Sequence, residues 1–299
     1  MGWTPEFNNR AANGDLTVGI IGLGYVGLPT AIGFHDSGFN VWGVDISQRT
    51  VDMVKRGENP TGDPDVNDII PAPGSERWNI TTSTSEAVPH CDVVLVTVPT
   101  PVTEDLKPDL SYVQSAGRDV FDSLVRGSRT VVVLESTVYP GVTAQTWLPE
   151  LEEIGLQIGV DVEIAYCPER VLPGNVMYEL VNNDRVIGGV DNISTEKAVS
   201  FYSKYVKGKL HKTNARTAEM CKLVENSSRD VQIAFANELS LICDKANINV
   251  WELIELANKH PRVNILQPGS GVGGHCIAVD PYFIVSDYPV ESKIIGMAR

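Results

Sequence analysis

Residues 17–45 read TVGIIGLGYVGLPTAIGFHDSGFNVWGVD, and this stretch decides the fold. An apolar strand pattern leads into a glycine motif, a helical pattern follows, and a second apolar strand pattern ends in an acid. The motif is Gly22-x-Gly24-x-x-Gly27 and the acid is Asp45. Glycines at this spacing between a strand and a helix, with an acid about 20 residues on, are typical of dinucleotide binding. The stretch therefore predicts the first strand–helix–strand unit of a doubly wound parallel sheet.

Each glycine of the motif has a separate task. Gly22 makes the turn, Gly24 lets the backbone approach the pyrophosphate, and Gly27 lets helix and strand pack closely. Asp45 is placed to bind the ribose hydroxyls and to repel a 2′-phosphate, which favours NAD over NADP, although Arg49 nearby weakens that preference. The alternative is a Rossmann-like fold that binds no nucleotide. The expected cofactor-binding residues are Gly22, Gly24, Tyr25, Val26, Gly27, Asp45, Arg49, Thr100 and Thr137.

Further buried strands of an α/β sheet are expected along the next part of the chain. Continuous apolar runs of this length are typical of parallel strands with both faces covered. They occupy residues 92–98, 130–134, 162–166 and 184–190, the last being expected to end the sheet. Polar groups follow three of these strands, including Thr100, Thr137 and Glu169. Since ligands bind at the carboxyl ends of such strands, these side chains are expected near the ligand.

From residue 213 the alternating pattern gives way to helices. No Gly or Pro occurs between Arg216 and Ile248, and apolar residues recur there at helical spacing. We therefore expect a polar tail over 1–15, an NAD-binding Rossmann domain over 16–212 and an all-helical central domain over 213–299. The chain is expected to be cut near a domain boundary or to be a natural short form.

Composition excludes several classes of partner. The net charge is −14 and the pI about 4.8, which argues against nucleic acid and anionic membranes. No apolar run reaches the length of a membrane span, and the first fifteen residues show no secretory signal. The five cysteines lack paired spacing, so neither a disulfide framework nor a metal site is expected. These features predict a cytoplasmic protein.

The loop GVGGHCIAVDP, residues 271–281, carries a candidate nucleophile. Cys276 lies in a glycine-rich setting and could react as a thiolate, although a packed turn is the ordinary alternative. Lys222 and Asn226 are four residues apart and so share one face of the long helix. For such helix residues solvation is the ordinary alternative. His275 is expected to be structural because neighbours in an extended loop point apart.

Together the motifs resemble the UDP-glucose/GDP-mannose dehydrogenase family over residues 17–299. Within it they are most similar to members that oxidise UDP-N-acetyl-D-mannosamine. Pro173 stands where UDP-glucose members have a second glutamate, and Val279 where many have a lysine. The stretches that carry the resemblance are CPERVLPG, DRVIGG, RDVQIAFANELSLIC, VWELIELANKHPRVNILQPG and GVGGHCIAVDPYF.

The resemblance implies an NAD-dependent four-electron oxidation of a UDP-sugar at C6 and a homodimer formed through the central helices. It also implies a third, UDP-binding domain, which is expected to be absent from this sequence. The implied catalytic residues are Cys276, Lys222, Asn226, Asp280, Glu169 and Thr137. The implied substrate contacts are Glu169, Arg170, Val171, Lys222, Asn226, Arg262 and Gly273, with Arg262 reaching into the partner subunit's site.

The sequence also allows other hypotheses for the substrate and the function. UDP-N-acetylglucosamine, UDP-N-acetylgalactosamine or UDP-glucose could be the substrate. A dehydrogenase of the 6-phosphogluconate or 3-hydroxyisobutyrate type would transfer one hydride without a cysteine. A non-catalytic NAD- or nucleotide-sugar-binding fragment would bind NAD without turnover.

Overall fold

The structure, a computed structural model, describes residues 3–171, 174–274 and 276–299. The chain divides into two compact units. Unit 1 comprises residues 1–100 and 110–220, and unit 2 comprises residues 101–109 and 221–299.

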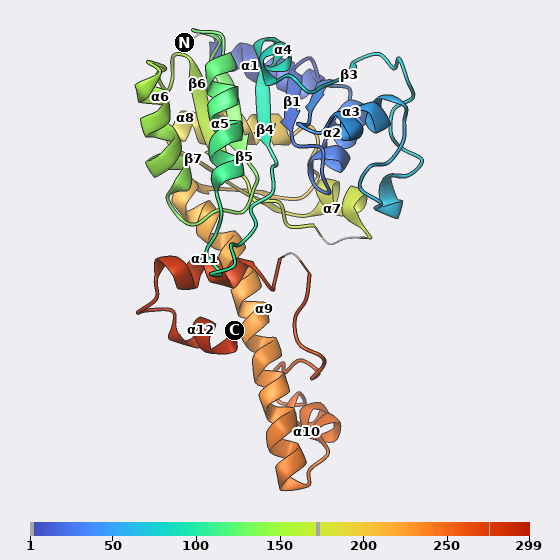
Figure 1. Cartoon of the computed structure of the whole chain (residues 1–299), viewed down its shortest axis with the longest axis vertical. Coiled ribbons are helices and arrows are strands. Elements are labelled where there is room, and N and C mark those ends of the chain that lie inside the picture. The colour runs from blue at the N-terminus through green and yellow to red at the C-terminus, as the bar shows by residue number, and fades with distance from the viewer. Residues whose placement is uncertain (1–2, 172–173, 275) are drawn as a thin grey trace. The chain divides into compact units, whose positions relative to one another are not determined.

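Unit 1 is built on one eight-stranded sheet with the order β3-β2-β1-β4-β5-β6-β7-β8 (Figure 1). Neighbouring strands run parallel except for the antiparallel pair β6 and β7. The strands are β1 (Thr17–Ile21), β2 (Asn40–Val44), β3 (Trp78–Thr81), β4 (Val93–Val96), β5 (Thr130–Leu134), β6 (Val162–Tyr166), β7 (Arg185–Gly189) and β8 (Leu210–Asn214). This arrangement confirms the doubly wound, mostly parallel fold.

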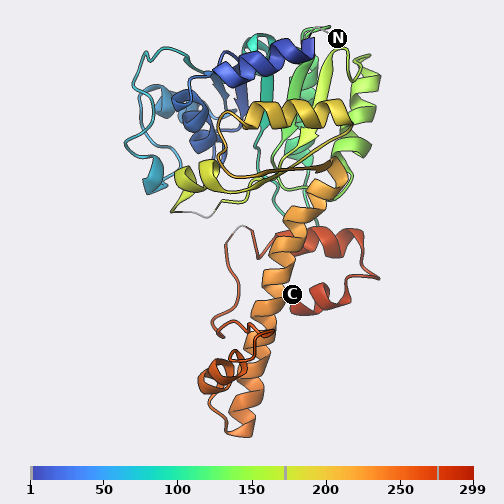
Figure 2. The same cartoon turned by 180° about the vertical axis from the view of Figure 1, so that it is seen from behind.

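Helices cover both faces of this sheet. Figure 1 shows α5 and α6 in front of it, and Figure 2 shows α1 and α8 in front of the opposite face. The helices of unit 1 are α1 (Trp3–Asn13), α2 (Gly27–Asp36), α3 (Gln48–Lys55), α4 (Thr84–Ala87), α5 (Ser111–Ser123), α6 (Leu148–Glu153), α7 (Val176–Asn182) and α8 (Asn192–Tyr202). Short 3₁₀ turns lie at Pro64–Val66 and Val88–His90, and a π-helical turn, η3, at Thr143–Trp147.

The core of unit 1 lies between the sheet and its helices. The central strands β4, β5 and β6 are buried along their whole length. Between α2 and α8, Phe34 stacks on Phe201 with ring centroids 4.7 Å apart. These contacts hold α2, and with it the glycine motif at its start, against the sheet.

Two elements of unit 1 differ from the sequence expectation. Residues 3–13 form α1, where a polar tail is expected, because Phe7 and Ala11 share one helical face and are buried. The sheet does not end at β7, since β8 pairs with β7 in parallel. The residues of β8 are LHKTN and mostly not buried, so this edge strand lacks the apolar run by which strands are recognised.

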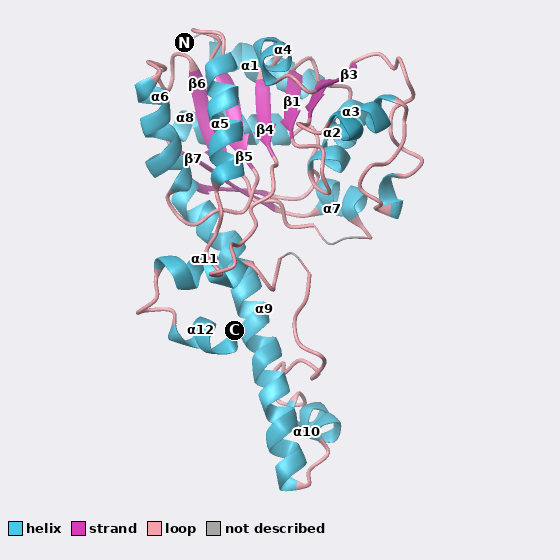
Figure 3. Cartoon of the chain, viewed as in Figure 1, coloured by secondary structure: helices cyan, strands magenta, loops and turns pink. Residues whose placement is uncertain are grey.

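Unit 2 consists of helices and loops in the part of the chain that the structure describes (Figure 3). The long helix α9 (Ala215–Ala246) begins in unit 1 and supplies the main element of unit 2. It is followed by α10 (Val250–Ala257), α11 (Asp280–Asp287) and α12 (Lys293–Ala298). A small set of buried apolar side chains holds these helices, including Ala236, Cys243, Ile254 and Phe283.

Candidate active site and family

The glycine motif lies where β1 passes into α2, and its geometry fits a dinucleotide. Gly22 has φ +97°, which strains any residue with a Cβ. A Cβ on Gly27 would lie 1.8 Å from the Gly22 carbonyl oxygen, so strand and helix touch here. A Cβ on Gly24 would meet nothing within 4 Å, so this side of the loop is open. No side chain caps the start of α2 at Val26, which leaves its N-terminus available to a pyrophosphate.

Asp45 is held firmly at the end of β2. Its carboxylate accepts hydrogen bonds from the Leu23 and Ser47 backbone N–H groups, both at 2.9 Å. The bond from Leu23 ties the acid to the glycine motif itself. Ile46 beside it is 90% exposed. Arg49 is exposed on α3.

The ends of β4 and β5 meet, as expected from their parallel order. The Ser136 hydroxyl donates to the Val98 carbonyl at 2.7 Å and so joins the segments that carry Thr100 and Thr137. Both threonines are half-buried. They therefore lie on neighbouring segments at the carboxyl edge of the sheet, where ligands of this fold bind.

The loop after β6 carries Glu169, which is 7% exposed. Its carboxylate accepts a hydrogen bond from the Val171 backbone N–H at 3.0 Å. Arg170 donates to the Asp184 carbonyl. Leu172 and Pro173 lie outside the described residues. The loop is thus fixed by its own polar groups close to the edge of the sheet.

In unit 2, α9 and α11 bring predicted site residues together. The Asn226 amide donates to the Asp280 carboxylate at 2.6 Å. Asp280 is 3% exposed, and burial raises its pKa to about 6, although the nearby Lys222 ammonium and the bond from Asn226 oppose the shift. Lys222, Asn226 and Asp280 therefore form one charged cluster.

The cysteine loop joins this cluster through its backbone. Cys276 is exposed, and its carbonyl accepts the Asp280 N–H at 2.8 Å, so the loop turns directly into α11. Gly274 has φ +81°, which requires glycine, and Gly273 is exposed. His275 lies outside the described residues. Arg262 is exposed and follows α10. It therefore belongs to a different segment of unit 2 from α9 and α11, which carry the cluster.

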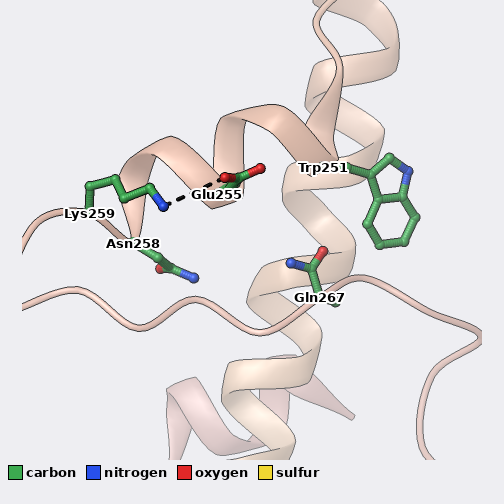
Figure 4. Close-up of a pocket in the computed structure, with 5 residues that line it drawn as sticks. All are labelled: Trp251, Glu255, Asn258, Lys259 and Gln267. Carbon is green, nitrogen blue, oxygen red and sulfur yellow. Dashed lines mark ion pairs between the residues drawn. The ribbon is translucent and has the colours of Figure 1, made fainter.

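A hollow of about 570 Å³ lies elsewhere in unit 2, between α10 and the segment after it (Figure 4). It is lined by Trp251, Glu255, Asn258, Lys259 and Gln267. None of the predicted catalytic residues lines it, and Lys259 faces Glu255 at 3.6 Å. The size of a hollow is therefore a poor guide to the site in this chain.

Within the described ranges 3–171, 174–274 and 276–299, no three His, Cys, Asp or Glu side chains come together as a metal would require. None of the helices there is both long enough and apolar enough to cross a membrane.

The family comparison agrees with this geometry. The NAD-binding domain of the UDP-glucose/GDP-mannose dehydrogenase family matches residues 16–206, and its central domain matches residues 216–296. The chain belongs to this family. NAD is accordingly its cofactor, and its activity class is that of the NAD-dependent nucleotide-sugar dehydrogenases.

Individual members of the family are similar over nearly the whole chain. UDP-N-acetyl-D-mannosamine dehydrogenase of Escherichia coli (strain K12) is 51% identical, over 95% of this chain and 68% of its own. NDP-N-acetyl-D-galactosaminuronic acid dehydrogenase of Ralstonia nicotianae is 50% identical, over 95% and 67%. The structure of a UDP-D-ManNAc dehydrogenase from Pyrococcus horikoshii superposes with a TM-score of 0.87 at 40% identity, over 95% and 67%.

Two buried acids of this family member were not predicted as site residues. Glu219, near the start of α9, accepts hydrogen bonds from the loop that follows Thr137. Glu135 follows β5 directly and accepts a hydrogen bond from Tyr202. Glu135 comes directly after an apolar run and Glu219 lies within a helical pattern, and sequence alone gives no partner for either.

Proposed function

We propose that the chain oxidises the C6 alcohol of UDP-N-acetyl-D-mannosamine to the carboxylate in two steps, through a covalent intermediate on Cys276. The observation that carries the proposal is the cluster in unit 2. A charged lysine, an amide and a buried carboxylate, joined by the Asn226–Asp280 bond, adjoin a loop with an exposed cysteine. One hydride transfer from an alcohol uses no nucleophile, whereas an aldehyde must first gain one before it can lose a second hydride, and a cysteine thiolate can supply it.

The chain's residues take the following roles in the first step. The C6 hydroxyl proton passes to a water held by Asp280 or Thr137 as C6 loses its first hydride. An aldehyde results. NAD, when bound, accepts one hydride in each of the two oxidations. Unit 1 has the residues to hold it, with Gly22, Gly24 and Gly27 at the pyrophosphate and Asp45 at the ribose.

In the second step the Cys276 thiolate adds to C6, and the carbonyl electron pair becomes an alkoxide. Lys222 and Asn226 stabilise this oxyanion, because a cation and an amide donor lower the energy of developing negative charge. Loss of the second hydride from C6 restores the carbonyl and gives a thioester.

Hydrolysis of the thioester completes the reaction. Glu169 and Asp280 position or deprotonate a water, which adds to the carbonyl carbon. The carbon–sulfur bond then breaks, the carboxylate leaves and the thiolate is regenerated. Glu169 suits this role because its carboxylate is nearly buried and is held by the Val171 N–H.

The test is the yield of NADH from limiting UDP-N-acetyl-D-mannosamine with excess NAD and a reducing agent. We expect two NADH per sugar and a transient covalent adduct on Cys276 in the intact mass of the protein. One NADH per sugar would identify a simple alcohol dehydrogenase. No NADH, with NAD still bound, would refute the proposal for this sugar.

UDP-N-acetyl-D-galactosamine is the second candidate substrate. The Ralstonia relative is named for an N-acetylgalactosamine derivative and is only one percentage point less identical than the Escherichia coli one. Comparing kcat/KM for the two sugars, with UDP-N-acetylglucosamine and UDP-glucose alongside, decides between them. A higher kcat/KM for the galactosamine sugar would replace the first assignment.

We further propose that two copies pair through α9 and α10. Supporting this, large apolar side chains are exposed along these helices, among them Leu241 at 70% and Trp251 at 55%. Such a patch is characteristic of an interface. Light scattering should give twice 32.5 kDa. Leu241→Glu should give the monomer, and Val160→Glu, at an apolar position in unit 1 that is 52% exposed, should leave the dimer intact.

A further inference from the structure

A group of ionisable side chains is buried at one edge of the sheet of unit 1. Glu135 follows β5, Cys167 follows β6, Arg185 opens β7 and Tyr202 closes α8. Their exposed fractions are 3%, 0%, 4% and 0%. Burying a cation and a carboxylate is costly unless they interact with each other or with further polar groups. The group therefore calls for an explanation beyond packing.

The contacts within this group centre on Glu135. Tyr202 donates its phenolic hydrogen to Glu135 Oε1 at 2.5 Å. Arg185 Nη1 lies 3.8 Å from the same oxygen, and the guanidinium carbon lies 5.5 Å from the Tyr202 ring centre. Within the described chain, Glu135 Oε2 and Arg185 Nη1 have no hydrogen-bond partner. The Arg185 guanidinium is thus attracted to the Glu135 carboxylate, but at 3.8 Å its Nη1 is too far away for a hydrogen bond.

Arg185 also lies near Glu169. The antiparallel pairing of β6 with β7 consists of Ala165 opposite Gly189 and Tyr166 opposite Gly188, and Glu169 follows in the loop after β6. The Glu169 and Arg185 side chains line the same small cavity beside Pro168. One buried guanidinium therefore has two carboxylates near it, one after β5 and one after β6.

The charges in this group follow from burial. Burial raises the pKa of Glu135 to about 7, although Arg185 and the Tyr202 hydroxyl oppose the shift, and the Glu169 carboxylate adds to it. Burial raises the pKa of Cys167 to about 12 and raises that of Tyr202 and Tyr205, so these three are neutral. Burial disfavours the charged form of Arg185, but Glu169 and the other acidic groups raise its pKa and keep it protonated.

We propose that Arg185 is a positioning residue that holds the Glu169 carboxylate, and that Glu135 competes with Glu169 for the same guanidinium. The proposal rests on the proposed function, in which Glu169 acts on the water that hydrolyses the thioester. When Glu135 is neutral, no second carboxylate competes with Glu169 for the Arg185 guanidinium. When Glu135 is ionised, the guanidinium is shared and a second negative charge stands near Glu169.

The decisive variant is Glu135→Gln, which removes the charge but keeps an oxygen for the Tyr202 hydroxyl. With a pKa of about 7, Glu135 is neutral below that pH and ionised above it. We therefore expect the wild-type hydrolysis rate to fall as pH rises through about 7, and we expect Glu135→Gln to lack this fall. The rate is read from the decay of the Cys276 adduct in rapid-quench mass spectrometry. The first NADH should form at the wild-type rate.

The matched control is Glu163→Gln. Glu163 is also fully buried and paired with an arginine, Arg129 at 2.5 Å, but this pair lies near the start of β6 rather than after its end. The same substitution there should leave the fall in hydrolysis rate near pH 7 in place. Loss of that fall in both variants would reduce the effect to a general loss of buried charge and overturn the proposal.

Arg185 itself is tested by graded replacement. Arg185→Lys keeps the charge, and we expect hydrolysis to slow about tenfold with more adduct accumulating, whereas Arg185→Met should slow it further. If Arg185→Met does not fold, the pH dependence of hydrolysis in Glu135→Gln still decides. If Glu135→Gln keeps the wild-type fall near pH 7, while wild type yields two NADH per sugar, this inference alone is overturned. A wild type that forms no adduct overturns the proposed function and this inference with it.

Discussion

Replacing Glu219 by glutamine should strongly destabilise unit 1. Glu219 is fully buried near the start of α9, and its carboxylate accepts three hydrogen bonds from the loop after β5. The donors are the Gly141 N–H at 2.5 Å, the Thr143 N–H at 2.9 Å and the Thr143 hydroxyl. These bonds hold the loop that begins at Glu135 and contains Thr137 against the helix.

The size of the effect follows from these three bonds. Hydrogen bonds to a charged group contribute about 1.5–3 kcal/mol each, and a buried unsatisfied group costs about 1–3 kcal/mol. A glutamine oxygen can still accept from Thr143, but more weakly because it is neutral. Its amide NH₂ would face the Gly141 N–H, donor against donor. Losing one charged bond, weakening two and adding an unsatisfied donor should lower the free energy of unfolding by roughly 3–5 kcal/mol.

Urea unfolding followed by tryptophan fluorescence measures this change. Trp147 is a buried reporter in the π-helical turn that follows the same loop. The control is Glu196→Gln, which breaks an exposed ion pair with Lys212 and should cost no more than about 1 kcal/mol. If the free energy of unfolding of Glu219→Gln lies within about 1 kcal/mol of the wild-type value, the three hydrogen bonds do not hold the loop against the helix.

Three further outcomes are expected. Cys276→Ser should bind NAD with wild-type affinity, measured by calorimetry, but yield no more than one NADH per sugar, and a yield of two would contradict the thioester route. Gly27→Ala should abolish NAD binding or folding, since its Cβ would lie 1.8 Å from the Gly22 carbonyl oxygen; unchanged urea midpoints and NAD affinity would show that the loop has room. Asp280, with a folded pKa of about 6 against an ordinary 3.8, binds its proton more tightly when folded, so its contribution to stability falls as pH rises from about 4 to 6. The free energy of unfolding of Asp280→Asn, measured by urea titration, should therefore rise relative to that of wild type by up to roughly 3 kcal/mol across that window. A difference between the two proteins that stays constant with pH would show that Asp280 does not titrate there.

The cofactor half of the site could be predicted because its signals are local. Strands β5 and β6 begin and end at the residues expected from their apolar runs. The glycine motif and Asp45 lie within one continuous stretch, so spacing alone brings them together. Elements without such a run were missed, namely the polar edge strand β8 and helix α1, whose apolar face rests on Phe7 and Ala11.

The unit 2 cluster could be predicted only in part. Helical spacing puts Lys222 and Asn226 on one face of α9, but nothing in the spacing brings Asp280 to them from 54 residues away. That contact depends on how α11 packs, and only the resemblance to the family pointed to it. Spacing therefore predicts which side chains share an element, and tertiary packing decides which elements meet.

Buried charge is where sequence patterns fail most clearly. Pattern reading assigns charged residues to the surface, yet Glu135 and Arg185 are almost completely buried. Glu135 contacts Tyr202 from 67 residues away, so its environment is created by the fold and not by its neighbours in the chain. Such a group is stable only while its partners stay in place, because removing one leaves an uncompensated charge in the interior. The positions that sequence patterns cannot assign are thus the ones at which single substitutions test the mechanism most directly.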